Sequence, residues 1–482
     1  MQRRAFLQGT AALAALHAFP GLARDVQSPP WALGFQGVSS DLPPLPMAVR
    51  GKIPEACTGT LYRNGPALYE RAGQRYRHWF DPDGMIQAFR FGREGAVHAG
   101  RFVRTRKFRQ EAAAGRFLFD GAGTRISGSL PPRNNDDFNT ANINVQAFDG
   151  ELLALWEAGS AYRVDPESLE TLGTRSWRED LAGVPFSAHP RFDGRGDLWN
   201  IGSVSFGAEP LLVLYHIDAA GRLRKARTHR LDFAGYMHDF VLTGRYLVAL
   251  NSSAVLGKGE TFIDSMRWEP SRASQLLVFD KDSFDLLHTV EVPAAFVFHF
   301  GNGWDTRSGL EFTACQYPDA RLATIGMARL ARQQPGPYHD EPRLLRYRVD
   351  LHRGQAAVTD LGIDLEFPGF DRRRPFEPQA LFGVSKGRNS PSGPASAVVR
   401  VNPSSGEVDR FDYGDGTLVE EPLPVPGPGA AASYLVHSYL DVERRRSGVS
   451  ILRADALADG PVATAEMDRV VPLGFHGCFL TA

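Results

Sequence analysis

Alternating apolar and polar positions recur along this chain and are interrupted by short polar turns. Each copy has an alternating run, then Asp or Asn with polar, Gly or Pro residues, then a second alternating run. Alternation with a period of two predicts strands, and this turn chemistry predicts tight hairpins. The five copies are YRVDPESLETLG (162–173), YHIDAAGRLRKART (215–228), LVFDKDSFDLLHTVEV (277–292), YRVDLHRGQAAVTDLG (347–362) and VRVNPSSGEVDRFDYG (399–414).

The distance between these hairpins predicts the architecture. The turn residues follow one another at intervals of 52 to 70 residues: Asp165, Asp218, Asp280, Asp350 and Asn402. Such intervals are typical of four-stranded blades with loops of variable length, so an all-β propeller is favoured over a sandwich. Helical periodicity is nearly absent, and Ile325–Gln333 is the clearest helical candidate.

Composition adds limits on the class of protein. The 54 basic and 55 acidic residues leave a net charge of −1, which lacks the basic footprint of a nucleic-acid binder, so no nucleic-acid partner is expected. Three cysteines are too few for a disulfide scaffold, and we expect buried structural thiols at Cys57, Cys315 and Cys478. Gly and Pro are spread evenly, which predicts one domain without a linker.

The N-terminus resembles a twin-arginine export signal. Arg3 and Arg4 precede a short, mildly apolar stretch and a small-x-small cleavage site that ends at Ala23. The apolar stretch is too short for a transmembrane helix. We therefore expect a signal peptide over residues 1–23, a mature domain over 24–482 and a periplasmic location. The alternative interpretation is a disordered basic tail.

Four histidines stand in unlike, mostly apolar motifs: His189 in SAHPRFD, His238 in YMHDF, His299 in FVFHFGNGW and His476 in PLGFHGCF. They are 49, 61 and 177 residues apart, so no single helix or hairpin carries them all. In a propeller, however, inner strands one blade apart meet at the axis. Four converging imidazoles would form an all-nitrogen site for iron, zinc or copper.

The motifs also occur in the order found in a known family. LYRNGPALYE…YRHWFDPDGMIQAFRF (61–91), ALWEAG, SAHPRFD, MHDF, FVFHFGNGW, LEFP and PLGFHGCF together resemble the carotenoid cleavage oxygenases, from about residue 36 to the C-terminus. The resemblance implies a seven-bladed β-propeller with loops and short helices forming a dome over the metal face. It also implies a non-haem Fe(II) held by His189, His238, His299 and His476.

The resemblance further implies glutamates that orient these histidines. Glu157, Glu366 and Glu421 match the positions, and Glu420 is an alternative to Glu421 because the register there is open. A ligating imidazole donates its second N–H to a carboxylate, which fixes the tautomer and the ring orientation. His78 is also a family residue, and we interpret it as structural.

The implied reaction is cleavage of a conjugated C=C bond by O2, which releases two carbonyl products. Iron carries the oxygen chemistry, so we assign no catalytic acid or base to the protein. An apolar apocarotenoid-like polyene is our first substrate hypothesis. The alternatives are a stilbene-cleaving oxygenase of the same family, a non-catalytic periplasmic ligand-binding propeller, and a metal-dependent hydrolase or lyase.

Departures from the family pattern bear on the substrate pocket. Ile143 stands where many members have Thr near the iron, and Phe298, Trp304 and Phe475 are further pocket candidates. His98 stands where lignostilbene dioxygenases have a phenol-binding Tyr, and the stretch expected to supply a Lys, PPRNNDDFNT, has none. A phenolic stilbene substrate is therefore disfavoured.

An apolar substrate suggests peripheral contact with a membrane. In the segment Phe117–Leu130 (FLFDGAGTRISGSL), Phe117, Leu118 and Phe119 are candidates for insertion into the lipid interface. The alternative interpretation is a buried strand followed by a turn.

Overall fold

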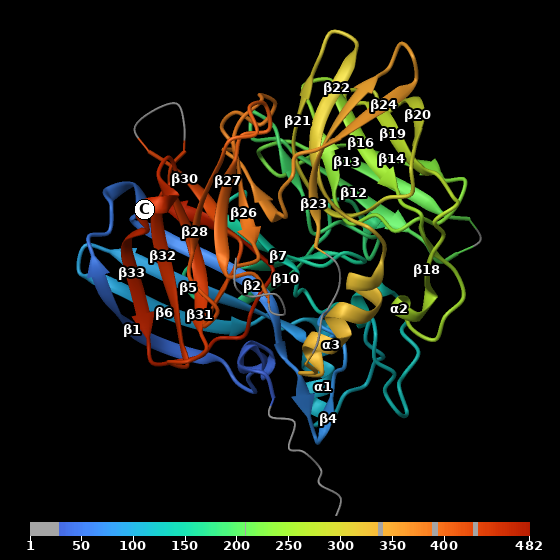
Figure 1. Cartoon of the computed structure of the whole chain (residues 1–482). Coiled ribbons are helices and arrows are strands. Elements are labelled where there is room, and N and C mark those ends of the chain that lie inside the picture. Colours follow the sequence, from blue (N-terminus) through green and yellow to red (C-terminus); the bar gives the residue numbers. More distant parts are fainter. Residues whose placement is uncertain (1–27, 208, 336–340, 388–393, 428–431) are drawn as a thin grey trace, which may run out of the picture.

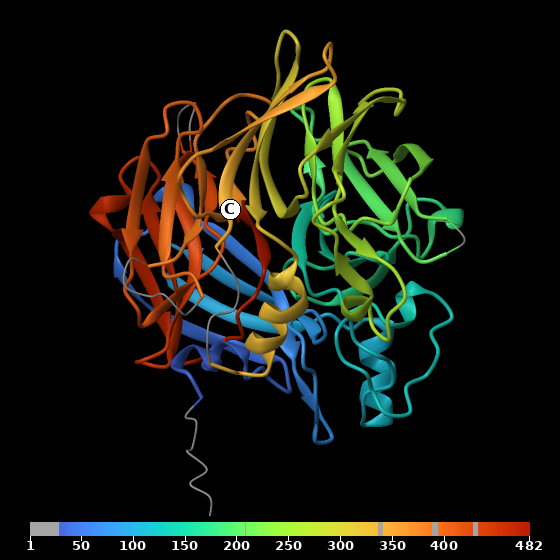
Figure 2. The same ribbon diagram turned by 45° about the vertical axis from the view of Figure 1, so that its right-hand side comes forward.

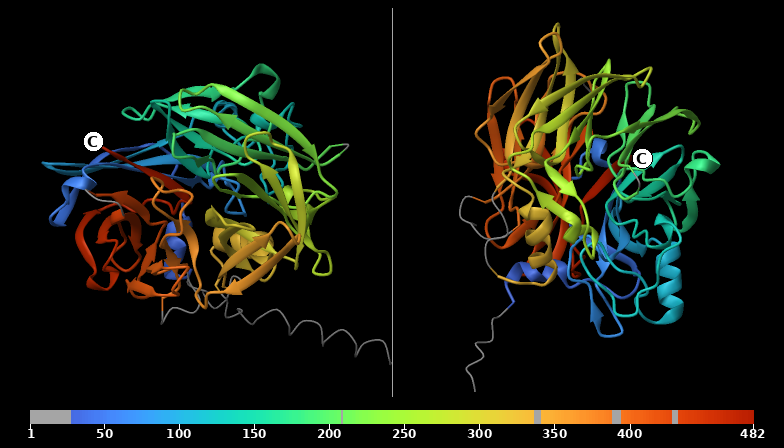
Figure 3. Two further views of the ribbon diagram at one scale, coloured as in Figure 1. Left: turned by 90° about the horizontal axis from the view of Figure 1, so that it is seen from above. Right: turned by 90° about the vertical axis from the view of Figure 1, so that its right-hand side faces the viewer.

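The computed structural model describes residues 28–207, 209–335, 341–387, 394–427 and 432–482. Most of these residues lie in antiparallel sheets that follow one another in chain order around a common centre (Figure 1; Figure 3, left). The fold is all-β and propeller-like. The predicted signal peptide lies outside the described residues.

Five of the sheets have four strands each. The first two are β7–β10 (Asn144–Phe148, Glu151–Leu155, Ala161–Val164, Thr171–Arg175) and β11–β14 (Arg191–Phe192, Leu198–Val204, Leu211–Ile217, Leu223–Arg230). The third consists of β15, β16, β19 and β20 (Phe240–Leu242, Tyr246–Asn251, Ser274–Asp280, Leu286–Val292). The others are β21–β24 (Phe296–Asp305, Gly309–Tyr317, Arg343–Asp350, Gln355–Asp360) and β25–β28 (Glu366–Gly369, Leu381–Ser385, Ala397–Val401, Val408–Asp412).

A ten-stranded sheet joins the two ends of the chain. Its order is β29-β31-β32-β33-β1-β6-β5-β2-β34, with β30 also paired to β31. In it β34 pairs with β2, so that His476 lies opposite Asn64. The bounds are β1 Leu42–Gly51, β2 Gly59–Leu68, β5 Asp83–Gly92, β6 Gly95–Phe102, β29 Thr417–Val419, β30 Leu423–Pro426, β31 Ala432–Asp441, β32 Arg446–Arg453, β33 Pro461–Met467 and β34 His476–Thr481.

The predicted hairpins are confirmed. Each of the five turns joins the third and fourth strands of a four-stranded sheet, which are the two strands farthest from the centre. The side chains of the turn residues accept backbone N–H groups two or three positions ahead; Asp165 accepts from Ser168 at 2.7 Å, and Asp280 accepts from Ser283 at 2.7 Å. Such bonds close the turn locally, which explains why turn chemistry in the sequence is sufficient to place it.

The helices are short and lie together on one side of the sheets (Figures 1 and 2). The predicted helix at Ile325–Gln333 corresponds to a π-turn, η5 (Leu322–Gly326), continued by α3 (Met327–Ala331). The helix α1 (Arg106–Ala114) was not predicted from the sequence, although Thr105 caps its start and Gly115, at φ 65°, ends it. The remaining elements are α2 Phe262–Ser265, η1 Pro30–Phe35, η2 Glu55–Cys57, η3 Asn135–Asp137, η4 Glu179–Leu181, η6 Leu457–Asp459, β3 Glu70–Arg71, β4 Gln74–Arg75, β17 Ala254–Leu256 and β18 Met266–Trp268.

The proposed lipid-inserting residues are buried, and that prediction was wrong. Phe117 is fully covered, while Leu118 and Phe119 are 8% and 4% exposed. The ring of Phe117 packs on Tyr76 with centroids 4.1 Å apart, so its apolar surface is already used inside the protein. All three cysteines are buried free thiols, as predicted. Within the described residues no helix is long and apolar enough to cross a membrane.

Candidate metal centre

The four histidines meet although they come from four separate parts of the chain. His299 lies in β21 and His476 begins β34. His189 and His238 each stand two residues before the first strand of a sheet, β11 and β15. One nitrogen from each ring lies within 4.8 Å of the other three, and all four side chains are buried. The first strands surround the centre, which makes neighbours of residues far apart in sequence.

The nitrogens that face one another are the Nε2 atoms. Nε2 of His189 lies 2.9 Å from that of His238, and Nε2 of His299 lies 3.1 Å from that of His476. A neutral imidazole has one N–H, and three of these rings direct theirs toward a carboxylate on the opposite edge, so their Nε2 atoms present lone pairs. Lone pairs this close repel one another unless a cation lies between them. The donor set therefore fits a transition-metal ion with four neutral nitrogen ligands.

Three carboxylates orient three of the rings. The contacts are Nδ1 of His238 to Oε1 of Glu157 at 3.0 Å, Nδ1 of His299 to Oε2 of Glu366 at 2.5 Å, and Nδ1 of His476 to Oε1 of Glu421 at 2.9 Å. Each fixes the tautomer that leaves Nε2 free. His189 has no carboxylate partner in the described part of the chain.

The structure also distinguishes Glu421 from Glu420. Glu420 turns away from the imidazoles, since its carboxylate accepts the Gly474 N–H at 2.6 Å and the Ser438 hydroxyl. Glu421 accepts the N–H groups of His476 and, at 2.9 Å, Gly477. The register left open by the sequence is therefore decided by which carboxylate faces the ring.

Electrostatics favour neutral imidazoles at His189 and His476 and an ionised Glu421, whereas His299 differs. Burial and the neighbouring imidazoles lower the pKa of His189 well below its usual value. Burial also lowers the pKa of His476, to about 4, despite the nearby Glu421. For His299, burial is outweighed by Glu366, which raises the pKa. Burial tends to raise the pKa of Glu421, but His476 and Arg63 bring it to about 2.

Two side chains that support the centre were not identified from the sequence. Arg63, 2% exposed, donates from Nη1 to Glu421 at 2.7 Å and from Nη2 to the Phe475 carbonyl at 2.8 Å. The Tyr236 hydroxyl donates to Oε2 of Glu157 at 3.2 Å. Both residues lie inside motifs quoted above, LYRNGP and YMHDF. Their position within these motifs was the one feature of the sequence that could have pointed to a role at the centre.

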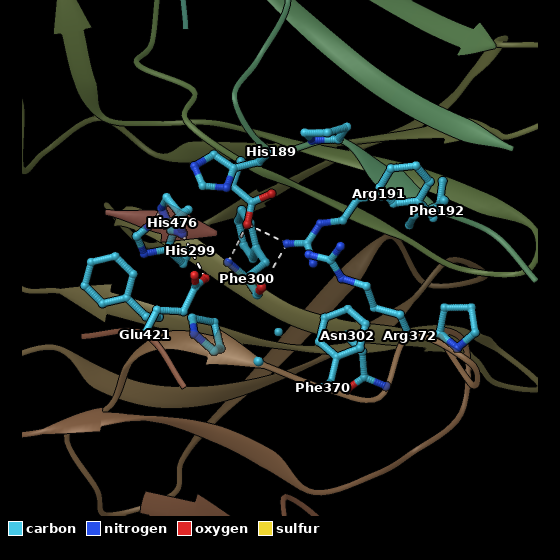
Figure 4. Close-up of a pocket in the computed structure, with 18 of the residues that line it drawn as sticks. His189, Arg191, Phe192, His299, Phe300, Asn302, Phe370, Arg372, Glu421 and His476 are labelled. Atoms are coloured by element: carbon cyan, nitrogen blue, oxygen red, sulfur yellow. Dashed lines mark hydrogen bonds and ion pairs between the residues drawn. The ribbon is translucent and has the colours of Figure 1, made fainter. Parts of the chain in front are cut away.

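Two mainly apolar cavities adjoin near the histidines, at lining residues that they share. The larger, about 450 Å³, extends past Trp156 and Met237. The smaller, about 160 Å³, is lined by three of the four histidines. Ile143 and Phe80 border both cavities. A third cavity of about 90 Å³ has a mixed polar and apolar lining and also reaches the histidines (Figure 4).

The predicted pocket residues separate into two groups. Ile143, Phe298 and Phe475 line the smaller apolar cavity. Trp304, five residues beyond His299 on β21, borders none of these three cavities because β21 carries it away from the centre. His98 is also outside them: it is fully buried on β6, with Nε2 2.8 Å from Oε1 of Gln87.

His78 is buried as well, and its Nε2 lies 2.8 Å from the Ala323 carbonyl. That contact ties the HWFDPDGM segment to η5 and agrees with a structural role. Nothing in its surroundings directs the ring toward the four-histidine cluster.

Comparisons with curated proteins find relatives along nearly the whole chain. Apocarotenoid-15,15'-oxygenase of Synechocystis sp. is 28% identical, over 93% of this chain and 95% of the relative. Isoeugenol monooxygenase of Pseudomonas nitroreducens is 27% identical, over 90% and 94%. Carotenoid 9,10(9',10')-cleavage dioxygenase 1 of Pisum sativum is 25% identical, over 94% and 90%.

Solved structures agree. A variant of Synechocystis apocarotenoid oxygenase superposes with a TM-score of 0.84 at 25% identity, covering 94% of this chain and 98% of that one. The cobalt-substituted form of that oxygenase gives 0.83 at 26% identity with the same coverage. A family model described as retinal pigment epithelial membrane protein matches residues 35–481. The chain thus belongs to this family, which includes the carotenoid cleavage oxygenases that its motifs resemble, and it is an oxygenase.

Proposed function

We propose that this oxygenase binds Fe(II) through the Nε2 atoms of His189, His238, His299 and His476. With O2 it cleaves a conjugated C=C bond of an elongated apolar substrate and releases two carbonyl products. The observation that carries this proposal is the pair of neighbouring apolar cavities, which share Phe80 and Ile143 and of which the smaller is lined by His238, His299 and His476. A substrate that occupies both cavities would have its central bonds next to the metal.

The protein's part in the reaction is to bind, orient and exclude water. When bound, iron supplies the dioxygen chemistry. Glu157, Glu366 and Glu421 hold the Nδ1 protons, so each Nε2 remains a donor. Phe298 and Phe475, both nearly fully buried, keep the metal side of the smaller cavity dry. No acid or base is assigned, because bond cleavage by O2 requires no proton transfer from a side chain.

For the substrate, an apocarotenoid-like polyene is our first candidate. It is supported by the volumes and apolar lining of the two cavities and by similarity to the Synechocystis apocarotenoid oxygenase. The second candidate is a shorter phenylpropanoid or stilbene, supported by a comparable identity to isoeugenol monooxygenase. Ile143 lines both cavities, so its side chain lies where a substrate that occupies both would have to pass.

A product screen tests the proposal. Anaerobically purified, iron-loaded protein is mixed with O2 and an apocarotenal, isoeugenol or a hydroxystilbene, and O2 uptake and aldehyde products are measured. We expect His299→Ala to lose both iron and turnover, whereas His288→Ala, on the outer strand β20, keeps both. Full iron retention by His299→Ala would overturn the ligand assignment, and no aldehyde from any substrate would overturn the reaction.

We also propose finer features of the fold and its location. The ten-stranded sheet counts as two blades that share β1, since the first part of β1 (Leu42–Met47) pairs with β6 and the second part (Ala48–Gly51) pairs with β33, which gives seven blades in all. The protein is exported by a twin-arginine signal and acts in the periplasm. Mass spectrometry of a periplasmic fraction should find a mature N-terminus near Arg24, and an intact Met1 there would refute export with cleavage.

Substrate delivery from a membrane surface is a further part of the proposal. Leu130 and Phe206 line the larger cavity and are 47% and 56% exposed, so they are better candidates for lipid contact than the buried Phe117. Liposome flotation should show weaker binding for Phe206→Asp than for wild type. Equal flotation of both proteins would remove this idea.

A further inference from the structure

The cavity of about 90 Å³, lined by polar and apolar side chains in similar measure, lies along the centre of the sheets. Its walls come from seven different elements, and five of these, β7, β11, β15, β21 and β25, are the first strands of their own sheets; the other two are β30 and β34. At one end it reaches His189, His299 and His476 (Figure 4). Two arginines, Arg191 and Arg372, also line it. We call this space the axial cavity.

Arg191 is only partly satisfied within the axial cavity. Its Nη2 donates to Oδ2 of Asp239 at 2.5 Å and to the Phe300 carbonyl at 2.8 Å. Its Nε is buried and has no hydrogen-bond partner in the part of the chain that the structure describes. The guanidinium also lies over the ring of Phe370, 5.7 Å from its centroid, which holds the group in place.

Arg372 reaches the same cavity from the loop between β25 and β26. Arg372 is an exposed residue, and its Nη1 donates at 2.6 Å to Oε1 of Gln146, whose side chain is buried. The guanidinium has no carboxylate partner among the described residues. The guanidinium groups of Arg191 and Arg372 lie close together (Figure 4). Asp239 pairs directly with Arg191.

We propose that the axial cavity binds a small oxyanion, a carboxylate or an ion of similar shape such as bicarbonate, between Arg191 and Arg372. Guanidinium groups recognise planar oxyanions through parallel N–H donors, and here the Nε of Arg191 and the second edge of Arg372 are free to donate. An anion offsets the repulsion between the two cations. A metal ion held by the histidines at the inner end would add to the attraction.

Calorimetry tests this site independently of turnover. Sodium acetate and sodium bicarbonate are titrated separately into iron-loaded, anaerobic protein, with ionic strength held constant by sodium chloride. We expect saturable binding of about one anion per chain, weakened roughly tenfold or more in Arg372→Met, because a charge-assisted hydrogen bond is lost. Arg353→Met, which removes the same charge from a side chain 79% exposed in the turn after β23, should bind like wild type.

A chemical readout covers the case in which Arg372→Met is poorly folded. In wild-type protein, saturating acetate should slow modification of Arg372 by phenylglyoxal but not that of Arg353, as followed by peptide mass spectrometry. Binding of acetate without bicarbonate would identify the ligand as an organic carboxylate, and binding of both would support the whole class. The proposal is overturned if the wild-type protein shows no saturable heat of binding, or if acetate does not protect Arg372 from phenylglyoxal.

Discussion

Substitution of Glu421 by Gln separates the effect of the carboxylate's charge and acceptor oxygens from the effect of the side chain's size. The carboxylate accepts three donors, Nδ1 of His476 at 2.9 Å, Nη1 of Arg63 at 2.7 Å and the Gly477 N–H at 2.9 Å. Glutamine keeps the size but replaces one acceptor oxygen by an NH2 group. That group must then face another donor, so His476 loses the contact that fixes its tautomer or Arg63 loses its counter-ion.

The expected magnitude follows from these contacts. Loss of a carboxylate behind a ligating imidazole typically weakens metal binding by about 10- to 100-fold, or about 1.4–2.7 kcal/mol. Removal of its carboxylate partner also leaves the buried Arg63 less well paired, which lowers the free energy of unfolding. Breaking an isolated buried ion pair costs about 3–5 kcal/mol. We expect a smaller loss here, because Glu420 lies 3.7 Å from Nη2 of Arg63 and still neutralises part of its charge. We therefore expect weaker iron binding together with moderate destabilisation.

Anaerobic competition with a chelator measures the iron affinity, and urea denaturation measures the stability. Glu420→Gln is the matched control, because Glu420 is adjacent and buried yet contacts Gly474 and Ser438 in place of an imidazole. It should lose stability and keep iron affinity. The reasoning is refuted if Glu421→Gln binds iron within twofold of wild type, or if Glu420→Gln weakens binding as much.

Three more outcomes are expected. Without metal, stability should fall as pH drops from about 6.5 to 4.5. In this range the unfolded chain takes up protons at His476 and His189, whereas in the folded chain burial lowers the pKa of both, to about 4 for His476, and keeps them neutral. His299, whose pKa is raised, acts in the opposite direction, and we expect the two lowered pKa values to outweigh it. Urea midpoints that do not change with pH would contradict this. Lys107→Met should destabilise the fold by about 3–5 kcal/mol, because it leaves Asp83 and Glu111 buried without their shared cation, 3.0 and 2.9 Å away; a loss below 1 kcal/mol in urea denaturation would count against it. Ile143→Ala should widen the junction between the apolar cavities, cost about 2–5 kcal/mol and shift turnover toward bulkier substrates, and unchanged relative kcat/KM values would argue against a limiting role.

Local chemistry explains which parts of the fold were predictable. The hairpins follow from alternation and from turn residues such as Asp165 and Asp280, whose side chains bond backbone groups two or three residues away. The helix α1 was missed because it carries Arg, Lys and Glu over RKFRQEAAA and shows little apolar periodicity. Its stability comes from tertiary contacts, including the buried Lys107 and Glu111, which a local window does not contain.

The sequence by itself determined the recurring hairpins, the ordered family motifs and the four histidines as the candidates to meet. Only the tertiary structure decided that Glu421 faces His476 while Glu420 does not, that Phe117 is buried, and that Trp304 lies outside the cavities. It also brought Arg63 to Glu421, 358 residues away. Periodicity and turn chemistry act between near neighbours and leave a mark in the sequence. Cavities and ion pairs form between strands of different sheets, so their partners are set by how the sheets close around the centre.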